Sequence, residues 1–298
     1  MTKRSLPFGF FNVNKPSGIT SHDVVARIRR KLGVKKVGHA GTLDPLATGV
    51  LVICVGDATR LAEYVMATTK GYTATVHLGV ETTTYDGEGK ITARQDVSDV
   101  TRDDIETLLP KFTGTLDQVP PLYSAIKKDG RKLYDLARAG ESVDLEPRPV
   151  IIESLTLVAW EPPFFVLDVV CGSGTYIRSL AHDIGASLGV GAHLAALHRT
   201  RSGTFDVENA VALDDLLDVE DPLQWLIPAA RAMEAFPTVH LSPVDLDDIH
   251  HGRVIEWHGA SDTIGAAIAP DGRLVAVLML EAGHARPHKV FSSQFNGS

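Results

Sequence analysis

A single carboxylate stands out in the segment from Gly38 to Leu51, whose sequence is GHAGTLDPLATGVL. Asp44 is its only acidic residue and precedes Pro45, whose ring disfavours the α conformation at Asp44 and favours an extended one. The glycines of this segment let the backbone approach other groups closely. An Asp-Pro step is also typical of an ordinary turn. In apolar surroundings, however, a carboxylate either takes up a proton or meets a cation, and its ionised form is a candidate nucleophile or base.

Two residues elsewhere in the chain are candidates to act with Asp44. Arg178, in the segment GSGTYIRSL, lies near the start of an expected helix and away from the apolar stripe that includes Ile177. It is the candidate cationic partner, and a solvated surface arginine is the alternative. Tyr72 begins an alternating strand and is either an aromatic stacking platform or a tyrosine packed at a strand end. The sequence alone does not bring these three residues together.

The elements that must position these residues are strands and helices without a regular alternation. We expect a short strand at FFNV, a helix capped by Thr20 or Ser21 and closed by Gly33, and a buried strand at VLVICVG. The segment KGYTATVHLGV has the pattern of a half-buried strand. A strand, a glycine-rich turn and a helix are expected at FFVLDVVCGSGTYIRSLAHDIGASLG. This mixture predicts an α+β fold with a mixed, largely antiparallel sheet.

Changes in composition predict two domains and one insertion. The segment from Gln118 to Pro149 is flanked by prolines and is polar and basic in its middle, so we expect it to leave the core. Near Pro237 the composition shifts toward short β segments, including GRLVAVLMLEAG, whose first residue Gly272 forms a hairpin turn with the preceding Asp271. We predict a domain over residues 1–234, with an insertion at about 118–149, and a small β-rich domain over residues 235–298.

Composition and charge limit the class of protein. Hydrophobic residues make up 44% of the chain and charged residues 22%, which is ordinary for a folded protein. No segment approaches the roughly 18 uninterrupted apolar residues of a membrane span, so we expect a cytoplasmic protein with no membrane partner. The net charge of −8 is uneven, because residues 27–36 (RIRRKLGVKK) hold six Lys or Arg and no acid, whereas residues 206–262 hold thirteen acids. This distribution favours nucleic acid binding at one face, with a solvated helix face as the alternative.

The sequence patterns typical of cofactor and metal sites are incomplete in this chain. Cys54 and Cys171 are far apart and each lies in an apolar run, so we expect buried thiols rather than a disulfide or metal ligands. Gly172 and Gly174 precede a helix, but Ile177 stands where a dinucleotide-binding fingerprint has its third glycine. His182 and Asp183 form a pair without further ligands at metal spacing, and Pro287 interrupts any helix between His284 and His288. We therefore expect neither a cofactor nor a metal.

Five segments occur in one order and spacing between about Phe10 and Gly203: NKPSGITS, GHAGTLDPLATGVL, KGYTATVHLG, QVPPLYSAIKKDGRKLY and GTYIRSLAHDIG. Together they resemble the TruB family of tRNA pseudouridine synthases. The resemblance implies the pseudouridine synthase fold, a thumb formed by the insertion and a PUA-like C-terminal domain. It also implies a cofactor-free isomerase that flips uridine 55 out of the T-loop of tRNA and converts it to pseudouridine. Such an isomerisation changes no oxidation state and needs no external group.

The resemblance also assigns roles to residues of this chain. Asp44 matches the catalytic aspartate, and Arg178 matches the arginine that pairs with it. Tyr72 matches the tyrosine that stacks on the target base and assists proton transfer. Tyr176 and Leu197 match residues that line the uracil pocket.

Further residues match RNA-binding positions of the family. His39 matches a histidine that contacts the flipped-out nucleotides, and Lys15 with Pro16 matches a motif that supports the site. The basic run at residues 27–36 is then expected to contact phosphates. The thumb contributes the same kind of contact through four basic residues, Lys127, Lys128, Arg131 and Lys132.

The C-terminal segment departs from the family pattern. VDLDDIHHGRVIEW is similar in kind to a PUA-type RNA-binding domain but is short and acidic, so we expect most RNA binding from the N-terminal domain and the thumb. The expected partner is the T-arm of tRNA, bound by a monomer without guide RNA. One alternative is a protein that mainly helps tRNA to fold. Another is a guide-RNA-dependent relative of the dyskerin type, against which the thumb-like insertion and the lack of long basic tails argue.

Overall fold

The computed structural model describes residues 7–121, 127–128, 131–132 and 145–291, and it divides into two compact units. The first unit comprises residues 1–43, 50–66 and 204–298, and the second comprises residues 44–49 and 67–203. The segment that holds Asp44 therefore belongs to the second unit, although the residues on either side of it belong to the first. The division predicted between residues 234 and 235 stays a prediction.

The first unit contains the strand order β14-β1-β3. Strand β1 (Gly9–Lys15) pairs in parallel with β14 (Val211–Ala212) and antiparallel with β15 (Ile227–Pro228). Strand β2 (Val37–His39) pairs antiparallel with β3 (Thr48–Val55), in which all residues but the first are buried. This confirms the buried strand predicted at VLVICVG. The remaining elements before the C-terminal sheet are α2 (Ala62–Met66), β13 (Phe205–Asp206), α6 (Leu213–Asp218) and 3-10 helices at Gly56–Leu61, Val207–Asn209, Pro222–Trp225 and Ala229–Met233.

Helix α1 (Ser21–Leu32) begins and ends where the sequence predicts. The Thr20 hydroxyl accepts a hydrogen bond from the Asp23 N–H at 3.1 Å, and the Asp23 carboxylate accepts one from the Thr20 N–H at 2.9 Å. These reciprocal bonds form a capping box, so Thr20 and not Ser21 is the N-cap. Gly33 ends the helix with a φ of 64°, a left-handed conformation that glycine adopts without strain.

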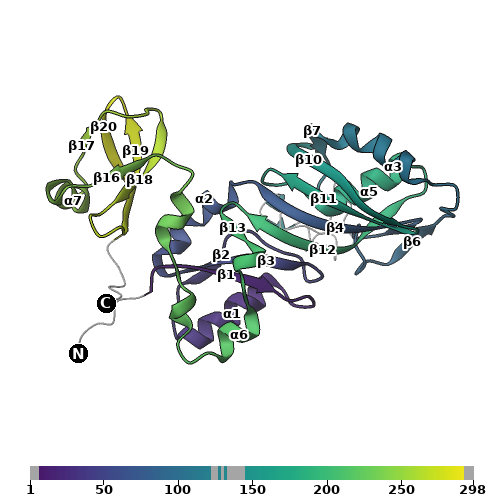
Figure 1. Cartoon of the computed structure of the whole chain (residues 1–298), viewed down its shortest axis with the longest axis horizontal. Coiled ribbons are helices and arrows are strands. Elements are labelled where there is room, and N and C mark those ends of the chain that lie inside the picture. The colour runs from purple at the N-terminus through teal and green to yellow at the C-terminus, as the bar shows by residue number, and fades with distance from the viewer. Residues whose placement is uncertain (1–6, 122–126, 129–130, 133–144, 292–298) are drawn as a thin grey trace. The chain divides into compact units, whose positions relative to one another are not determined.

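The second unit contains an antiparallel run of strands in the order β12-β4-β11-β10-β7. Their bounds are β4 (Lys70–Leu78), β7 (Gly114–Gln118), β10 (Arg148–Glu161), β11 (Phe164–Cys171) and β12 (Ala192–Ser202). Thr48 and Gly49, the first residues of β3, pair in parallel with His198 and Arg199 of β12. The strands are thus mixed and largely antiparallel, which confirms the predicted α+β fold class (Figure 1).

Helices cover parts of this second unit. Helix α5 (Ile177–Ser187) packs against β12 and β4, and α3 (Arg102–Leu108) with the 3-10 helix Leu109–Phe112 packs against β10. A separate antiparallel pair is formed by β5 (Val80–Thr82) and β6 (Ile91–Arg94). Along β4, buried residues alternate with partly exposed ones from Thr73 to Leu78, as predicted for a half-buried strand.

Residues near the C-terminus form a five-stranded sheet in the order β16-β18-β19-β20-β17. The elements are β16 (Thr238–His240), α7 (Pro243–His250), β17 (Ile255–Trp257), β18 (Thr263–Ile268), β19 (Leu274–Glu281) and β20 (Gly283–Val290). Asp271 and Gly272 connect β18 to β19, and Gly272 has a φ of 83°. The predicted hairpin turn and the β-rich character of this part are confirmed.

The insertion predicted at residues 118–149 is described only in part. Strand β8 (Lys127–Lys128) pairs antiparallel with β9 (Arg131–Lys132). These are the four basic residues predicted to contact phosphates, and their side chains lie outside what the structure describes, as do residues 122–126, 129–130 and 133–144. Their role stays a prediction.

Both cysteines are free and buried, as predicted. Cys54 is 0% exposed and Cys171 is 1% exposed. Burial raises the pKa of the Cys54 thiol to about 12 and that of the Cys171 thiol to about 11. No helix within the described ranges has both the length and the apolar character needed to cross a membrane.

We expect Ellman's reagent to label neither cysteine of the folded protein within minutes at about pH 8, because burial excludes the reagent and the raised pKa values leave little thiolate. Both cysteines should react at once in guanidinium chloride. The measurement is the absorbance of the released thiolate product, with Cys54→Ala and Cys171→Ala variants to assign each thiol. Fast release of one equivalent from the folded protein would contradict the burial of that cysteine.

Candidate active site

Arg178 and Asp44 form a two-pronged ion pair in the second unit. The Arg178 Nε lies 2.9 Å from Asp44 Oδ2, and Nη2 donates a hydrogen bond to Oδ1 at 3.4 Å. The Arg178 side chain is 7% exposed and the Asp44 side chain is 34% exposed. The alternative of a solvated surface arginine is therefore wrong. The carboxylate, by contrast, keeps a face that an incoming group can reach.

A second carboxylate holds the other side of the Arg178 guanidinium. Asp86 Oδ2 lies 3.1 Å from Nη1, which also donates to the Thr84 carbonyl at 3.3 Å. Asp86 is 3% exposed, and its Oδ1 accepts hydrogen bonds from Thr84 Oγ1 at 2.5 Å and from the Glu88 N–H at 3.1 Å. Because a buried charge is costly without partners, these contacts fix the orientation of the guanidinium plane.

The start of α5 is anchored to the end of β7, which sets the position of Arg178. The Gln118 amide donates to the Tyr176 carbonyl at 3.0 Å and accepts from the Tyr176 N–H at 2.8 Å. The Ser179 hydroxyl donates to the Val119 carbonyl at 2.8 Å. Residues on both sides of Arg178 are thus tied to one neighbouring strand end, so the helix cannot turn its arginine away from Asp44.

Ser21 holds the chain that leads into Asp44. The Ser21 hydroxyl accepts a hydrogen bond from the Leu43 N–H at 2.9 Å and donates one to the Leu43 carbonyl at 3.0 Å. After Asp44 the chain turns, since the Asp44 carbonyl accepts from the Ala47 N–H at 3.1 Å. The Asp-Pro step therefore forms a turn and also presents a paired carboxylate.

Tyr72 belongs to the same group of side chains. It lies on β4 directly opposite Arg199 of β12, and the Arg199 guanidinium is hydrogen-bonded to its hydroxyl. Burial raises the pKa of the Tyr72 phenol, the Asp44 charge adds to the rise, and Arg199 opposes it. The phenol therefore keeps its proton at neutral pH. The second unit thus brings Asp44, Tyr72 and Arg178 together, although the sequence alone could not.

The two residues predicted to line a uracil pocket lie on elements that border this group. Leu197 is 8% exposed and pairs with Ala74, two residues before the Arg199 and Tyr72 pair in a regular stretch of the sheet. Because side chains alternate along a strand, Leu197 is on the same face as Arg199. Tyr176 immediately precedes α5. Their contact with a base stays a prediction.

Lys15 and His39 lie in the first unit. Lys15 is 0% exposed, and its Nζ donates to the carbonyls of Pro16 at 2.9 Å and Ile19 at 2.7 Å, so it stabilises the turn between β1 and α1. The His39 ring packs edge-on against His22, with ring centroids 5.3 Å apart. The RNA contact expected of His39 stays a prediction.

Sequence reasoning missed Asp86 and Arg199. Asp86 lies in the polar segment TTTYDGEGK, where a carboxylate has nothing to distinguish it from an ordinary loop residue. Arg199 left a usable signal, since it shares a strand face with the apolar Leu197 in an alternating pattern and is only 2% exposed. A charged residue at a core position of a strand indicates a buried partner.

The arrangement can act as an acid-base and nucleophilic site. A paired and accessible carboxylate can attack an electrophilic carbon or take a proton, and the nearby phenol can give or accept one. Among the residues that the structure describes, no group of three or more His, Cys, Asp or Glu side chains could hold a metal ion.

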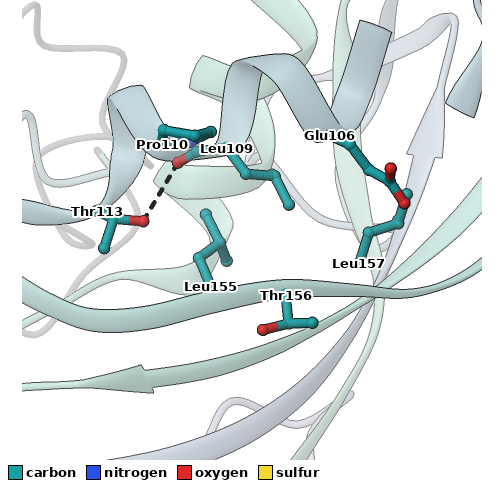
Figure 2. Close-up of a pocket in the computed structure, with 7 residues that line it drawn as sticks. All are labelled: Glu106, Leu109, Pro110, Thr113, Leu155, Thr156 and Leu157. Atoms are coloured by element: carbon teal, nitrogen blue, oxygen red, sulfur yellow. Dashed lines mark hydrogen bonds between the residues drawn. The ribbon is translucent and has the colours of Figure 1, made fainter. Parts of the chain in front are cut away.

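A pocket of about 570 Å³ lies elsewhere in the second unit, between α3 with its following 3-10 helix and β10 (Figure 2). Its lining residues are Glu106, Leu109, Pro110, Thr113, Leu155, Thr156 and Leu157. A hydrogen bond from the Thr113 hydroxyl to the Leu109 carbonyl, 3.2 Å long, closes one end of the helical segment (Figure 2). None of the predicted site residues lines this pocket.

Three family models together match the chain from residue 29 to residue 292. They describe the N-terminal domain of TruB family pseudouridylate synthase (residues 29–177), the C-terminal domain of tRNA pseudouridylate synthase B (178–233) and the C terminus of tRNA pseudouridine synthase II (236–292). The chain belongs to the TruB family of pseudouridylate synthases. It is therefore an enzyme of the isomerase class that forms pseudouridine in tRNA.

Individual relatives in the TruB family cover most of the chain. The tRNA pseudouridine synthase B of Syntrophotalea carbinolica is 47% identical over 246 residues, which is 82% of this chain and 80% of that protein. The enzyme of the same name from Thermobifida fusca is 45% identical over 292 residues, covering 95% of this chain and 98% of that protein. The long alignments extend the TruB assignment to the C-terminal part.

Solved structures show the same TruB-like fold. A Cbf5-Nop10-Gar1 complex contains a chain that matches with a TM-score of 0.76 at 30% identity, covering 96% of this chain and 86% of that chain. A chain in an H/ACA RNP bound to a substrate RNA matches with a TM-score of 0.74 at 28% identity, and the match covers 96% of this chain and 85% of that chain. These structures confirm the predicted pseudouridine synthase fold with a β-rich C-terminal part.

We predict that Ser21→Ala lowers activity by loosening the backbone before Asp44. The change leaves the buried Leu43 N–H and carbonyl without the serine hydroxyl, at a cost of about 1–3 kcal/mol of unfolding free energy. Urea unfolding measures that cost, and the single-turnover rate of pseudouridine formation measures the effect on the site.

Thr20→Ala is the matched control for this prediction. It removes the N-cap of the same helix, which costs about 1 kcal/mol of unfolding free energy, but it leaves the Leu43 contacts intact. We expect Thr20→Ala to be destabilised yet close to the parent in rate. Equal rates for the two variants would contradict the role given to Ser21.

Proposed function

We propose that this chain converts uridine 55 in the T-loop of tRNA to pseudouridine, without a cofactor and with Asp44 as the catalytic carboxylate. One observation carries the proposal: a carboxylate with 34% of its side chain exposed is held by a buried arginine near the partly exposed phenol of Tyr72. The motifs that resemble the family place the same three residue types at these positions. The substrate named by the relatives is tRNA, which supports the choice of RNA.

The reaction breaks the bond between N1 of uracil and C1′ of ribose and forms a bond between C5 and C1′. The hydrogen on C5 leaves, and N1 gains a proton, so the composition of the nucleotide is unchanged. Asp44 acts at the sugar, as the nucleophile at C1′ or as the base that removes a ribose proton. Both routes need an ionised carboxylate, which Arg178 favours through charge-assisted hydrogen bonds.

Tyr72, Tyr176 and Leu197 bind the target base. The target uridine must leave its stack, which costs a few kcal/mol, and stacking on the Tyr72 ring offsets part of this cost. The phenol hydroxyl, protonated at neutral pH, assists proton transfer at the detached uracil. Tyr176 and Leu197 line the pocket from the start of α5 and from β12.

The T-arm of tRNA binds through its phosphates and its folded shape. Five exposed cations in the basic run support this, namely Arg27, Arg29, Arg30, Lys35 and Lys36. His39 contacts the flipped-out nucleotides, Lys15 supports the turn after β1, and Lys127, Lys128, Arg131 and Lys132 of the thumb add phosphate contacts. The protein acts as a cytoplasmic monomer without guide RNA.

A guide-dependent function is the alternative, because two of the similar solved structures are assemblies with further components, one of them an RNP with a substrate RNA. Those chains are 28% and 30% identical to this one, whereas relatives named tRNA pseudouridine synthase B are 44–49% identical. The higher identity favours the stand-alone form. A role in tRNA folding is compatible with either.

The test is tritium release from a T-arm hairpin labelled at C5 of its uridines, with purified protein and no other RNA or protein. We expect the parent to release the label of uridine 55 only, because C5 loses its hydrogen as the new bond forms. Asp44→Asn keeps the size of the side chain and removes its charge, so release should fall by at least about 1,000-fold while hairpin affinity changes little.

A hairpin with cytidine in place of uridine 55 is the substrate control and should release nothing. Release from that hairpin would contradict the choice of uridine 55. Full activity of a folded Asp44→Asn variant would contradict the role of Asp44. A parent that releases label only after a guide RNA and partner proteins are added would favour the guide-dependent alternative.

A further inference from the structure

Arg199 is a buried cation next to the candidate active site, and the mechanism proposed above gives it no role. It lies on β12 and is 2% exposed, one of the largest fully buried side chains among the described residues. Its Cα partner across the antiparallel ladder is Tyr72 of β4. Directly opposed residues project from the same face of a sheet and contact each other. The ladder itself therefore places the guanidinium against the phenol.

The hydrogen bond between these two side chains has one possible direction. A guanidinium has only donors, so the oxygen of the Tyr72 hydroxyl must be the acceptor. The hydroxyl keeps its own proton and must direct it away from Arg199. The charge of Asp44 also acts on the Tyr72 phenol. A hydroxyl proton that points away from Arg199 can be donated to another group.

The backbone of Arg199 is held as firmly as its side chain. Arg199 pairs in parallel with Gly49, five residues after Asp44 in the chain. Gly49 has a φ of +95°, and a Cβ added there would lie 2.3 Å from the Arg199 carbonyl oxygen. Only glycine permits this approach. One residue therefore links the segment that carries Asp44 to the strand that carries Tyr72.

The charges around this phenol make the placement of Arg199 costly. Lys70, on the same strand as Tyr72, is 6% exposed, and burial followed by the Arg199 charge lowers the pKa of Lys70 to about 8. Asp44 and Cys171 are the other groups that act on the phenol. Two buried cations on one sheet face oppose folding, so a gain at the site is the simplest reason for keeping Arg199 there.

We propose that Arg199 is a positioning residue for Tyr72, donating a hydrogen bond that fixes the phenol ring beside Asp44 and directs its proton toward the substrate. The inference rests on the proposed function. Arg199 does not itself touch the uridine. Its effect on the reaction therefore passes through the Tyr72 hydroxyl and disappears when that hydroxyl is absent.

A double-mutant cycle tests this coupling, with Arg199→Met, Tyr72→Phe and the double variant. The readouts are the single-turnover rate of tritium release from the T-arm hairpin and the affinity for that hairpin. Arg199→Met should lower the rate by about tenfold to a hundredfold, as expected for loss of a charge-assisted hydrogen bond, with affinity within about twofold. In the Tyr72→Phe background the same change should alter the residual rate by less than about threefold.

Two further variants separate positioning from a structural role. Arg199→Lys retains a donor and should recover a large part of the rate lost in Arg199→Met. Arg201→Met removes the same charge two residues along β12, opposite Gly71, and should leave the rate within about twofold of the parent. Far-UV circular dichroism and thermal unfolding verify folding, and Arg199→Gln replaces Arg199→Met in the cycle if the latter does not fold.

The inference would be overturned if Arg199→Met lowered the single-turnover rate by the same factor in the parent and in the Tyr72→Phe variant. It would also be overturned if Arg199→Lys were as slow as Arg199→Met. These outcomes are distinct from failure of the proposed function. If the parent itself releases no label from uridine 55, the function is wrong. If the parent releases label and the two losses are additive, the function stands and the inference about Arg199 alone is wrong.

Discussion

The Arg178 guanidinium, held between the carboxylates of Asp44 and Asp86, is the interaction on which the site depends. Because an arginine side chain does not lose its charge in proteins, a buried guanidinium needs anionic partners in the folded state. Asp86 is 3% exposed and Asp44 is 34% exposed. The buried carboxylate of Asp86 therefore holds the guanidinium, whereas the more exposed carboxylate of Asp44 can be reached by another molecule.

The surrounding elements are organised to keep this arrangement in place. Gln118 and Ser179 tie the start of α5 to the end of β7, and Ser21 ties the backbone before Asp44. The ladder between β4 and β12 sets Tyr72 opposite Arg199. Neutral side chains and backbone groups thus hold the charged side chains of the site in place.

Features that depend on neighbouring residues could be predicted from the sequence, and contacts between distant residues could not. Local patterns predicted the helix start near Thr20, the alternating burial along β4 and the turn at Gly272. The contact between Asp44 and Arg178 spans 134 residues and was accessible only through a family resemblance. Asp86 was missed because a loop carboxylate looks the same whether solvated or buried. Burial of that kind is a property of the assembled fold.

The most direct test of this account is the single-turnover rate of an Asp86→Asn variant on the T-arm hairpin. The variant keeps the size and an acceptor oxygen of Asp86 but removes the charge that holds Arg178 from behind. The account predicts a rate lower by about tenfold to a hundredfold with little change in hairpin affinity, because the substitution acts through Arg178 on the orientation of Asp44. A folded variant that reacts as fast as the parent would contradict the claim that the two-carboxylate arrangement makes Asp44 competent.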